Sequence, residues 1–542
     1  MAGATTAVDA DVLIVGAGVA GSLAGWTLAQ AGAKVLILEA GPRVLRAEAF
    51  ATFRRAPART PESPYPEVPH APRPVSEDPH HYYIQDGPDL FKSTYERRVG
   101  GTTWHWLGTT LRFLPQDFLL RTRYGVGADW PIGYEDLEPW YCKAEQALGV
   151  AGDDREDLGS PRSRPYPLPP IPSTYLDRQV TSAIAPLGLK VQPTPQARNS
   201  QFHDGRPPCC GSASCIPICP IGAKYDATVH VQKAEMLGAR VVENAVAAFI
   251  EVDSTGQVAA IRFMRPDGSP HRATARIYVL AAHAIETPKL LLMSRTSALP
   301  DGVGNSSDQV GRNLMDHPVQ LSWALAKEPL YPYRGPLATS GVEHLRDGPV
   351  RSRRATYRIE ISNDGWAWPQ GDPTATASGL IRSGLRGRAL IDRLNERTSR
   401  ELHLAGLVEQ LPQPENRIIP AFDHPDALGI PRPRIRYRMD DYTFRGMADA
   451  RAVHERIFRA LDASELHHSQ TYEGAGHVMG TYRMGTDPKT SVVNAEQRSH
   501  DHPNLFLLGS GVFPVSGTAN PTLTIAALAL RAAETIRQDL SR

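Results

Sequence analysis

Residues 11–39 decide the fold and read Asp-Val-Leu-Ile-Val-Gly-Ala-Gly-Val-Ala-Gly-Ser-Leu-Ala-Gly-Trp-Thr-Leu-Ala-Gln-Ala-Gly-Ala-Lys-Val-Leu-Ile-Leu-Glu. Asp11–Val15 is a short apolar run typical of a buried strand, and a glycine-rich turn follows it. The next residues have a helical pattern that ends at Gly32, and Lys34–Leu38 is a second apolar strand. The stretch therefore predicts a βαβ unit of the Rossmann type.

Three glycines and one acid give this unit the spacing of a dinucleotide-binding fingerprint. Gly16 permits the tight turn, Gly18 lets the backbone approach a pyrophosphate, and Gly21 lets the helix pack closely against the strand. The helix N-terminus offers free N–H groups to the phosphates. Glu39 ends the second strand and suits a ribose with a free 2′-hydroxyl, so NAD or FAD is favoured over NADP. The alternative is a packing motif that binds no ligand.

Composition sets wider limits. Lys plus Arg number 59 and Asp plus Glu 58, a net charge of +1, which excludes a nucleic-acid binder driven by bulk charge. Hydrophobic residues form 41% of the 542, enough to exclude a wholly disordered chain. No apolar run approaches the roughly 18 residues that span a bilayer. Residues 1–11 lack the regions of a secretory signal, so these features alone predict a cytoplasmic location.

A second glycine-rich segment, Arg98-Val-Gly-Gly-Thr-Thr-Trp-His-Trp106, lies outside the βαβ unit. Its paired glycines, Gly100 and Gly101, and the following Thr102 suit a backbone that lies against a flat ring and donates N–H groups to it. Several further segments share with it a resemblance to the GMC (glucose–methanol–choline) flavoprotein oxidoreductases. They are residues 129–141, 282–294, 312–318, 474–485 and 517–524.

This resemblance covers nearly the whole chain except about 330–400, and it implies FAD as the cofactor. The implied fold is α/β (α+β), with a Rossmann-like FAD-binding domain interleaved with a sheet-and-helix substrate domain of the GMC type. The FAD-binding domain is expected at 8–150, 225–325 and 470–540. The substrate domain is expected at 151–224 and 326–469.

The resemblance also implies the catalytic residues. His477 matches the family's catalytic histidine, and Asn520 matches a second position that is His or Asn. Oxidation of an alcohol by flavin moves a hydride to flavin N5 while a base removes the hydroxyl proton. Neutral His suits that base, and Asn can only orient the same oxygen. Ser510 and Thr522 are expected at the ring end of the flavin.

His105 stands in a context similar to that of a histidine linked covalently to flavin in pyranose oxidase, another family member. The resemblance implies a covalent tether or a contact to the flavin. The alternative is a histidine that forms hydrogen bonds within its own loop.

Four of the five cysteines cluster within eleven positions, with Pro220 after the last. They are Cys209, Cys210, Cys215 and Cys219. Thiolates on a loop of small residues and prolines suit an iron–sulfur cluster. Zinc usually shows Cys-x-x-Cys pairs, which are absent here, and disulfides between such close cysteines would be strained.

The cysteine loop, 204–222, resembles that of bacterial multi-subunit glucose, fructose, sorbitol and gluconate dehydrogenases. That resemblance implies a [3Fe–4S] cluster on Cys210, Cys215 and Cys219, with Cys209 as a bystander. It also implies a dehydrogenase, not an oxidase, with a multihaem cytochrome c subunit as partner. A small chaperone-like subunit would carry the export signal, which places the complex in the periplasm and on the membrane only through its partners.

The substrate is expected to be a sugar or a sugar-derived alcohol. In the glucose enzymes a polar residue, often Asn, is expected just before the catalytic histidine, and here Gly476 occupies that place. The departure leaves room for a glycoside, a polyol or another alcohol. Residues 330–400 are expected to line the pocket, with Ser362 as a candidate contact. Two rivals stay open: an O2-using sugar or alcohol oxidase, and a non-redox lyase on the same fold.

Overall fold

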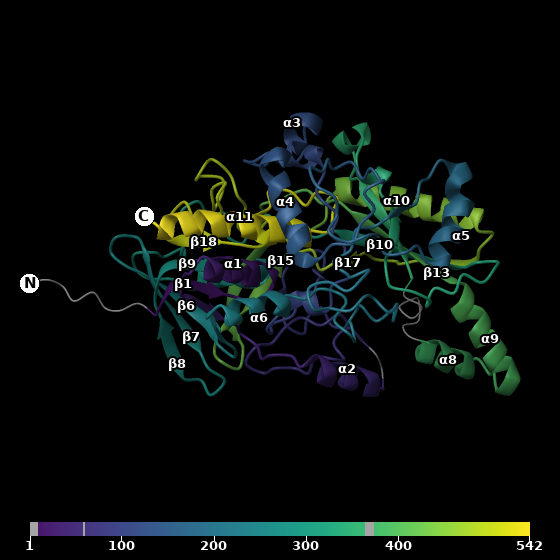
Figure 1. Ribbon diagram of the computed structural model, residues 1–542, viewed down its shortest axis with the longest axis horizontal. Helices are drawn as coiled ribbons and strands as arrows, with labels where there is room; N and C mark the ends of the chain where they lie inside the picture. Colours follow the sequence, from purple (N-terminus) through teal and green to yellow (C-terminus); the bar gives the residue numbers. More distant parts are fainter. Residues whose placement is uncertain (1–8, 58–59, 364–372) are drawn as a thin grey trace, which may run out of the picture.

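The computed structural model describes residues 9–57, 60–363 and 373–542. Two large sheets dominate it, one in each half of the molecule (Figure 1). Helices and sheets of both halves belong to one extended hydrophobic core. The predicted α/β (α+β) architecture, with a Rossmann-like unit and a second sheet-and-helix region, is confirmed.

The first large sheet has five parallel strands in the order β18-β9-β1-β2-β5. Its strands are β1 (Ala10–Val15), β2 (Val35–Leu38), β5 (Arg240–Val242), β9 (Ala275–Leu280) and β18 (Leu505–Leu507). Parallel strands buried on both faces read as continuous apolar runs, and these do so. Three distant parts of the sequence therefore build one sheet.

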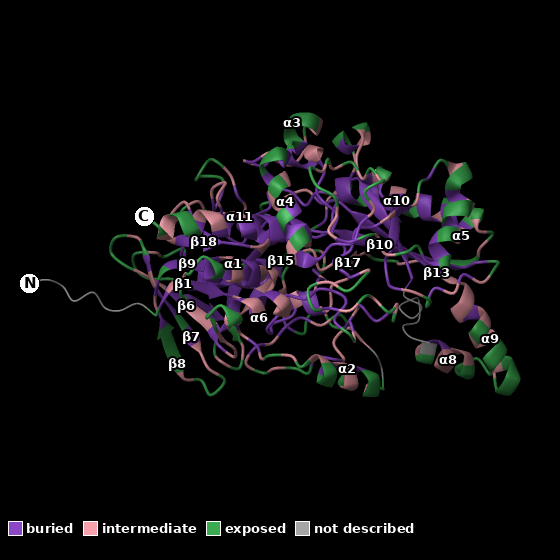
Figure 2. Ribbon diagram, in the orientation of Figure 1, coloured by how far each residue is buried: buried purple, intermediate pink, exposed green. Residues whose placement is uncertain are grey.

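Helices cover this sheet and one another (Figure 2). α1 (Val19–Gln30) packs against α11 (Thr522–Leu540) and α6 (Thr228–Met236), and α11 also packs against α4 (Tyr134–Leu148). Alanines and glycines along α1 and α11 allow these helices to approach closely. The N-terminal ends of α1 and α11 both reach the cavity described below.

The second large sheet is mainly antiparallel, in the order β16-β10-β13-β12-β11-β4, with β17 paired to β10. Its strands are β4 (Gln192–Pro193), β10 (Pro318–Leu325), β11 (Ser340–Val342), β12 (Tyr357–Ser362), β13 (Glu401–Val408), β16 (Ser464–His468) and β17 (Glu473–Gly474). α10 (Asp441–Ala460) packs against β10 and β13. The pairing of β17 with β10 brings the segment that follows Gly474 to the edge of this sheet.

Two smaller sheets and the remaining helices complete the described part of the chain. The sheets are β14 (Arg417–Pro425), β15 (Pro431–Arg436) and β3 (Ile84–Gln85), and β6 (Val246–Val252), β7 (Val258–Met264) and β8 (Pro270–Ala273). The helices are α2 (Arg46–Arg55), α3 (Leu120–Tyr124), α5 (Tyr175–Ile184), α7 (His283–Met293), α8 (Pro373–Arg382) and α9 (Gly387–Arg400).

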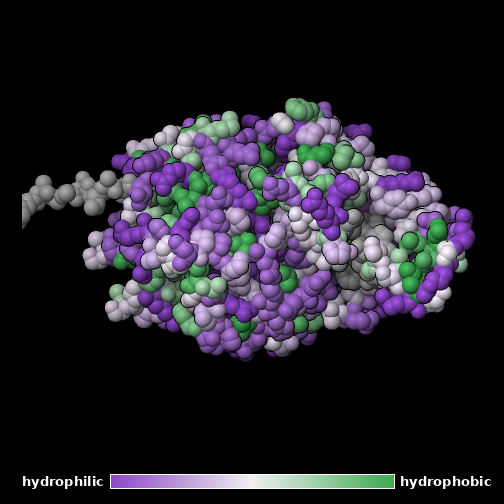
Figure 3. All heavy atoms as spheres, turned by 90° about the horizontal axis from the view of Figure 1, so that it is seen from below, coloured by the Kyte–Doolittle hydropathy of each residue, from purple (hydrophilic) through white to green (hydrophobic). Residues whose placement is uncertain are grey.

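α8 and α9 form a hairpin at the edge of the molecule (Figure 1). Hydrophobic and hydrophilic residues are mixed over the face of the molecule seen in Figure 3. Within the described residues, no helix combines the length and the apolar character needed to cross a membrane.

The division into domains stays a prediction, and the sheets bear on one boundary. β10 falls inside 225–325, the stretch assigned to the FAD-binding domain, yet it pairs within the seven-stranded sheet. Residues 364–372, in the part expected to line the pocket, lie outside the described residues.

Candidate active site

A cavity of about 440 Å3 lies where the carboxyl end of β1, the first turn of α1 and the loop before α11 meet. It brings together most of the site residues expected from the sequence. They are Gly16, Gly18, Glu39, Gly101, Thr102, His105, Gly476, His477, Ser510, Asn520 and Thr522. Gly21, in the first turn of α1, and Gly100, next to Gly101, do not line the cavity.

Two of the three fingerprint glycines allow close packing of the backbone, and the third leaves space for a ligand. A Cβ at Gly16, where φ is 104°, would lie 2.5 Å from the carbonyl oxygen of Ala281. A Cβ at Gly21 would lie 2.0 Å from the carbonyl oxygen of Gly16. At Gly18 a Cβ would meet nothing within 4 Å, so this residue faces open space. No side chain caps the start of α1, whose N–H groups are therefore available to a pyrophosphate.

Glu39 lies at the carboxyl end of β2, where a dinucleotide ribose binds in this fold. Its carboxylate accepts hydrogen bonds from the backbone N–H of Ala17 at 2.8 Å and of Gly41 at 3.1 Å. Burial raises the pKa of Glu39 in spite of these bonds, which lower it. The side chain ties the glycine-rich turn to the second strand and borders the cavity.

The second glycine loop lies directly against the first. Gly100 and Gly101 have φ of 99° and 55°, in the left-handed region that favours glycine. A Cβ at Gly101 would lie 3.1 Å from the Cα of Gly18. The Thr103 hydroxyl donates to the carbonyl oxygen of Gly100 at 2.5 Å and fixes the turn. Gly101 is thus needed where the two backbones meet, and Gly100 where a Cβ would lie 2.6 Å from Nε1 of Trp104.

His105 borders the cavity, and a buried carboxylate orients its ring. Its Nδ1 is 3.5 Å from Oε1 of Glu96, which also pairs with Arg73 and Arg98. Burial would raise the pKa of Glu96, but the hydrogen bond with His105 and the two guanidinium charges outweigh it and hold that pKa below its usual value. The position suits a contact to the flavin, and a covalent link stays a prediction.

His477 and Asn520 lie next to each other in the wall of the cavity. His477 follows β17, and Asn520 lies two residues before α11. Nε2 of His477 is 3.3 Å from Nδ2 of Asn520. The catalytic pair expected from the sequence is therefore close enough to contact one substrate oxygen.

A second histidine determines which nitrogen of His477 carries the proton. Nε2 of His317 is 3.0 Å from the carbonyl oxygen of Gly517, which can only accept, so this nitrogen bears the proton. Nδ1 of neutral His317 then accepts from Nδ1–H of His477 at 2.8 Å. This leaves Nε2 of His477 unprotonated toward Asn520, as a general base requires.

Both imidazoles are held neutral. Burial lowers the pKa of His317 to about 4. Burial, then the neighbouring His317 and Arg358, hold the pKa of His477 well below its usual range. Neither ring is protonated at neutral pH, so the proton assignment above applies there.

Asp316 fixes the backbone on both sides of this histidine pair. Its Oδ1 accepts from the N–H of His317 at 2.7 Å and of His477 at 2.9 Å. Its Oδ2 accepts from the Ser93 hydroxyl, which in turn accepts from the N–H of Gly476 at 2.9 Å. Burial raises the pKa of Asp316 to about 6. The loop that carries the base is thereby tied to the start of β10.

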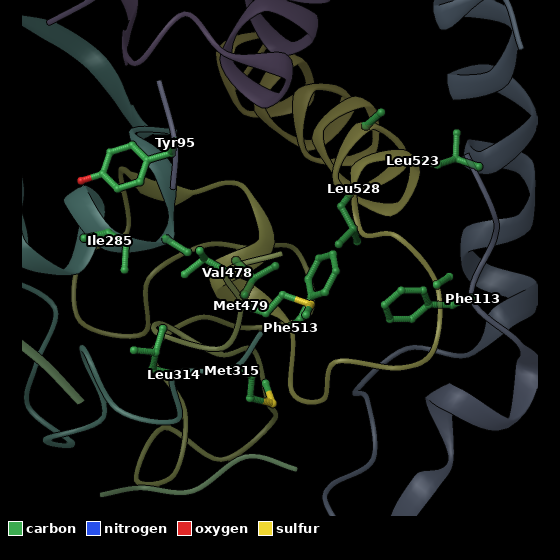
Figure 4. Close-up of a cluster of buried hydrophobic side chains, with 14 of the residues drawn as sticks. Tyr95, Phe113, Ile285, Leu314, Met315, Val478, Met479, Phe513, Leu523 and Leu528 are labelled. Carbon is green, nitrogen blue, oxygen red and sulfur yellow. The ribbon is translucent and has the colours of Figure 1, made fainter. Parts of the chain in front are cut away.

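Apolar side chains fill the space behind the catalytic loop (Figure 4). Val478 and Met479, next to His477, lie among buried residues of α7, α11 and the loop before β10. Ile285, Leu314 and Leu528 represent these three elements. Close packing leaves the loop little freedom to move.

The cysteine loop borders the same cavity through Ile216. Cys210 is exposed, Cys209 is half-buried, and Cys215 and Cys219 are buried. Burial raises the pKa of the Cys209 thiol, Arg198 lowers it, and the neighbouring Cys215 and Cys219 raise it further. Cys210 is thus the most exposed of the four, and the ligand set of Cys210, Cys215 and Cys219 stays a prediction.

Cationic side chains lie beside this loop. The Lys224 ammonium is buried and donates to the carbonyl oxygens of Trp106 and Cys215. No group of three His, Cys, Asp or Glu side chains within the described residues is arranged to hold a single metal ion. A multi-iron cluster differs, because each of its cysteines binds a different iron.

Ser362 does not line the cavity. It lies at the end of β12, on the sheet face that also carries Arg358 and Glu360, because side chains alternate along a strand. Sequence reasoning missed His317, Asp316, Ser93 and Arg358 as site residues. His317 and Asp316 belong to the segment 312–318, whose resemblance to the family could have indicated that they lie at the site. Nothing in the sequence connects Ser93 or Arg358 to the site.

The fold and the site together define an FAD-dependent oxidoreductase that acts on CH–OH groups. Comparisons with known proteins agree: models of the GMC oxidoreductase family match residues 169–319 and 412–529, and a model of NAD(P)-binding Rossmann-like domains matches residues 14–65. The chain belongs to the GMC oxidoreductase family.

Relatives with known names extend this result. The fructose dehydrogenase large subunit of Gluconobacter japonicus is 40% identical over 98% of this chain and 99% of its own length. The 6'''-hydroxyparomomycin C oxidase of Streptomyces lividus is 31% identical over 98% of this chain and 92% of its own. Pyridoxine 4-oxidase from Mesorbium loti, a solved structure, is 18% identical and covers 97% of this chain and 99% of its own, with a TM-score of 0.65, so it shares the fold.

Proposed function

We propose that the protein oxidises a sugar or a sugar-derived alcohol as a dehydrogenase, and that fructose is the first substrate to test. The observation that carries the proposal is the pairing of an unprotonated His477 Nε2 with Asn520 at one cavity that also borders a cysteine loop. The 40% identity to a fructose dehydrogenase subunit supports the substrate class. Gly476, where glucose enzymes are expected to carry a polar residue, favours a substrate other than glucose.

The residues fit FAD. The open space at Gly18, the uncapped start of α1 and the acid at the end of β2 match the pyrophosphate and ribose of a dinucleotide. Gly16, Gly18, Gly21, Glu39, Gly100, Gly101, Thr102, His105, Ser510 and Thr522 would hold it. Bound FAD supplies the hydride acceptor.

The protein's own residues manage the proton. A substrate hydroxyl placed between Nε2 of His477 and Nδ2 of Asn520 gives its proton to the histidine and accepts a hydrogen bond from the amide. His317 keeps Nε2 of His477 unprotonated before the substrate binds. No proton therefore has to move within the histidine pair before the substrate hydroxyl gives up its proton. Partial burial of the pair lowers the local dielectric constant and strengthens these interactions.

The cysteine loop is proposed to hold a [3Fe–4S] cluster through Cys209, Cys215 and Cys219. Cys215 and Cys219 are buried and Cys209 is half-buried, whereas Cys210, the ligand expected from the sequence, is exposed. The buried Lys224 and Arg198 would offset the negative charge of an iron–sulfur group. Such a cluster passes electrons one at a time, which suits a multihaem cytochrome c partner and not O2.

Partner subunits and location follow from the same resemblance. The fructose dehydrogenase relative is named as a large subunit, which supports assembly with other subunits. We propose a small chaperone-like subunit and a cytochrome c subunit, with the complex in the periplasm and on the membrane through these partners.

Turnover in air separates the proposal from its main alternative, an O2-using oxidase, a class that includes the Streptomyces lividus relative. Purified protein is given fructose, glucose, sorbitol and gluconate, and O2 consumption is measured with and without a dye acceptor. The dehydrogenase proposal predicts dye reduction with at least one substrate and negligible O2 uptake. Rapid O2 uptake without the dye would establish the oxidase instead.

A further inference from the structure

Arg358 on β12 is fully buried, and it reaches the catalytic pair from the second sheet. Its Nη1 donates to Oδ1 of Asn520 at 3.3 Å and to Oε2 of Glu360 at 2.9 Å. Its Nε and Nη2 donate to Glu343, at 3.1 and 2.8 Å, and Nη2 also donates to Thr194 at 3.2 Å. All five guanidinium N–H groups therefore have acceptors.

This contact decides how the Asn520 amide is turned. A guanidinium only donates, so the atom of Asn520 that faces it must be the oxygen. The NH2 group then points the other way, and it lies 3.3 Å from Nε2 of His477. In this orientation the amide can donate to a substrate oxygen, while the histidine nitrogen beside it accepts the hydroxyl proton.

The surroundings of Arg358 hold it in one position. Glu343 and Glu360 clamp it from two strands, β12 and the end of β11. Gly341 on β11 leaves the necessary room, because a Cβ there would lie 2.6 Å from Oε1 of Glu343 and 3.0 Å from Nη2 of Arg358. A rigid five-bond clamp suits a residue that must orient another.

We propose that Arg358 is a positioning residue for the reaction: it turns the Asn520 amide so that its NH2 group meets the substrate oxygen, and its positive charge acts on the neighbouring His477. This inference rests on the proposed function, in which His477 is the base. Arg358 touches neither the cavity nor the reacting atoms, so it acts through Asn520 and through its field.

The charge effect has a definite sign. The groups that act on His477 are the neighbouring His317, the Arg358 cation and, through its backbone, the Asp316 carboxylate. A nearby cation disfavours the imidazolium and so lowers the pKa of His477. Removal of that cation raises the pKa, and the acid limb of kcat/KM moves to higher pH.

Two substitutions separate the two roles. Arg358→Lys keeps the charge but cannot form five bonds, so kcat should fall about 10-fold or more, as for the loss of a hydrogen bond to a charged group, with the acid limb unmoved. Arg358→Met should lower kcat as well and move the acid limb to higher pH. Gly341→Ala, which displaces the clamp without removing it, should lower kcat less than Arg358→Lys.

A double-mutant cycle tests the route through Asn520. Arg358→Lys should lower the rate of anaerobic flavin reduction about 10-fold in the wild-type background and less than about 2-fold in Asn520→Ala, because coupled residues are not additive. Arg351→Lys is the matched control, since Arg351 is also fully buried between carboxylates, Asp117 and Glu409, and does not line the cavity. Thermal melting of each variant separates folding defects from site effects.

Additive losses in the cycle, or a normal rate in Arg358→Lys with a normal melting temperature, would overturn the inference. Equal losses in Arg351→Lys would do the same. Failure of the proposed function is a different outcome, because then no sugar or alcohol would reduce the flavin of the wild-type protein.

Discussion

Replacement of His317 by Phe tests how the base acquires its proton pattern. Nδ1–H of His477 donates at 2.8 Å to Nδ1 of His317, which is fully buried. Phe leaves that donor without a partner, which costs about 1–3 kcal/mol. His477 would avoid the cost by moving its proton to Nε2, where it can no longer act as a base. At 1.36 kcal/mol per factor of ten, the competent form and kcat/KM should fall by about 5- to 150-fold.

The assay is anaerobic stopped-flow reduction of the flavin at a fixed substrate concentration. His317→Gln is the rescue variant, since its amide oxygen can accept from His477 while its NH2 group donates to the Gly517 carbonyl. His454→Phe is the control, because His454 is also buried and bonded through Nδ1, to Ser322 on the far side of the sheet. The reasoning is refuted if His317→Phe reduces flavin at the wild-type rate, or if His454→Phe is equally slow in a folded protein.

Three further results are expected. Cys209→Ser should remove most of the bound iron while Cys210→Ser keeps it, measured as iron and acid-labile sulfide per chain; the reverse pattern would restore the assignment made from sequence. The plot of kcat/KM against pH should stay level from pH 7 down past 6.5, because the base must be neutral and burial holds the pKa of His477 well below that value; an acid limb above pH 6.5 would contradict this. Denatured wild-type protein should retain flavin fluorescence on a gel and His105→Ala should not, and flavin that is released from the wild-type protein would exclude the covalent tether.

Local sequence patterns predicted much of the nucleotide-binding part of the fold. The strands at 11–15 and 34–38 and the helix between them were predictable because each pattern depends on neighbouring residues alone. β1 (Ala10–Val15) and β2 (Val35–Leu38) follow those predictions within a residue, and α1 ends at Gln30, two residues before Gly32. By contrast, the place of β10 in the second sheet depends on pairing with β13, about 80 residues away, and no local pattern shows it.

The site divides in the same way. His477 and Asn520 were found because they stand in recognisable motifs, and the structure places them 3.3 Å apart. Arg358 was not found, because an arginine in a strand of alternating polar residues reads as a solvated side chain. Only the fold shows that β12 reaches the loop before α11. The burial of adjacent cysteines is equally hard to predict from the sequence, because the path of the backbone decides whether Cys209 or Cys210 is the more exposed.

The central claim is that this cavity binds FAD and passes it a hydride from a sugar or alcohol, with His477 as the base. The most direct test is the anaerobic absorbance spectrum of purified wild-type protein and of His477→Gln, before and after addition of fructose and the other candidate substrates. The account predicts a flavin band beside a broad iron–sulfur shoulder, bleached by at least one substrate in the wild-type protein and at least about 100-fold more slowly in His477→Gln. A fully loaded flavin that no sugar or alcohol bleaches, or one bleached equally fast without His477, would contradict it.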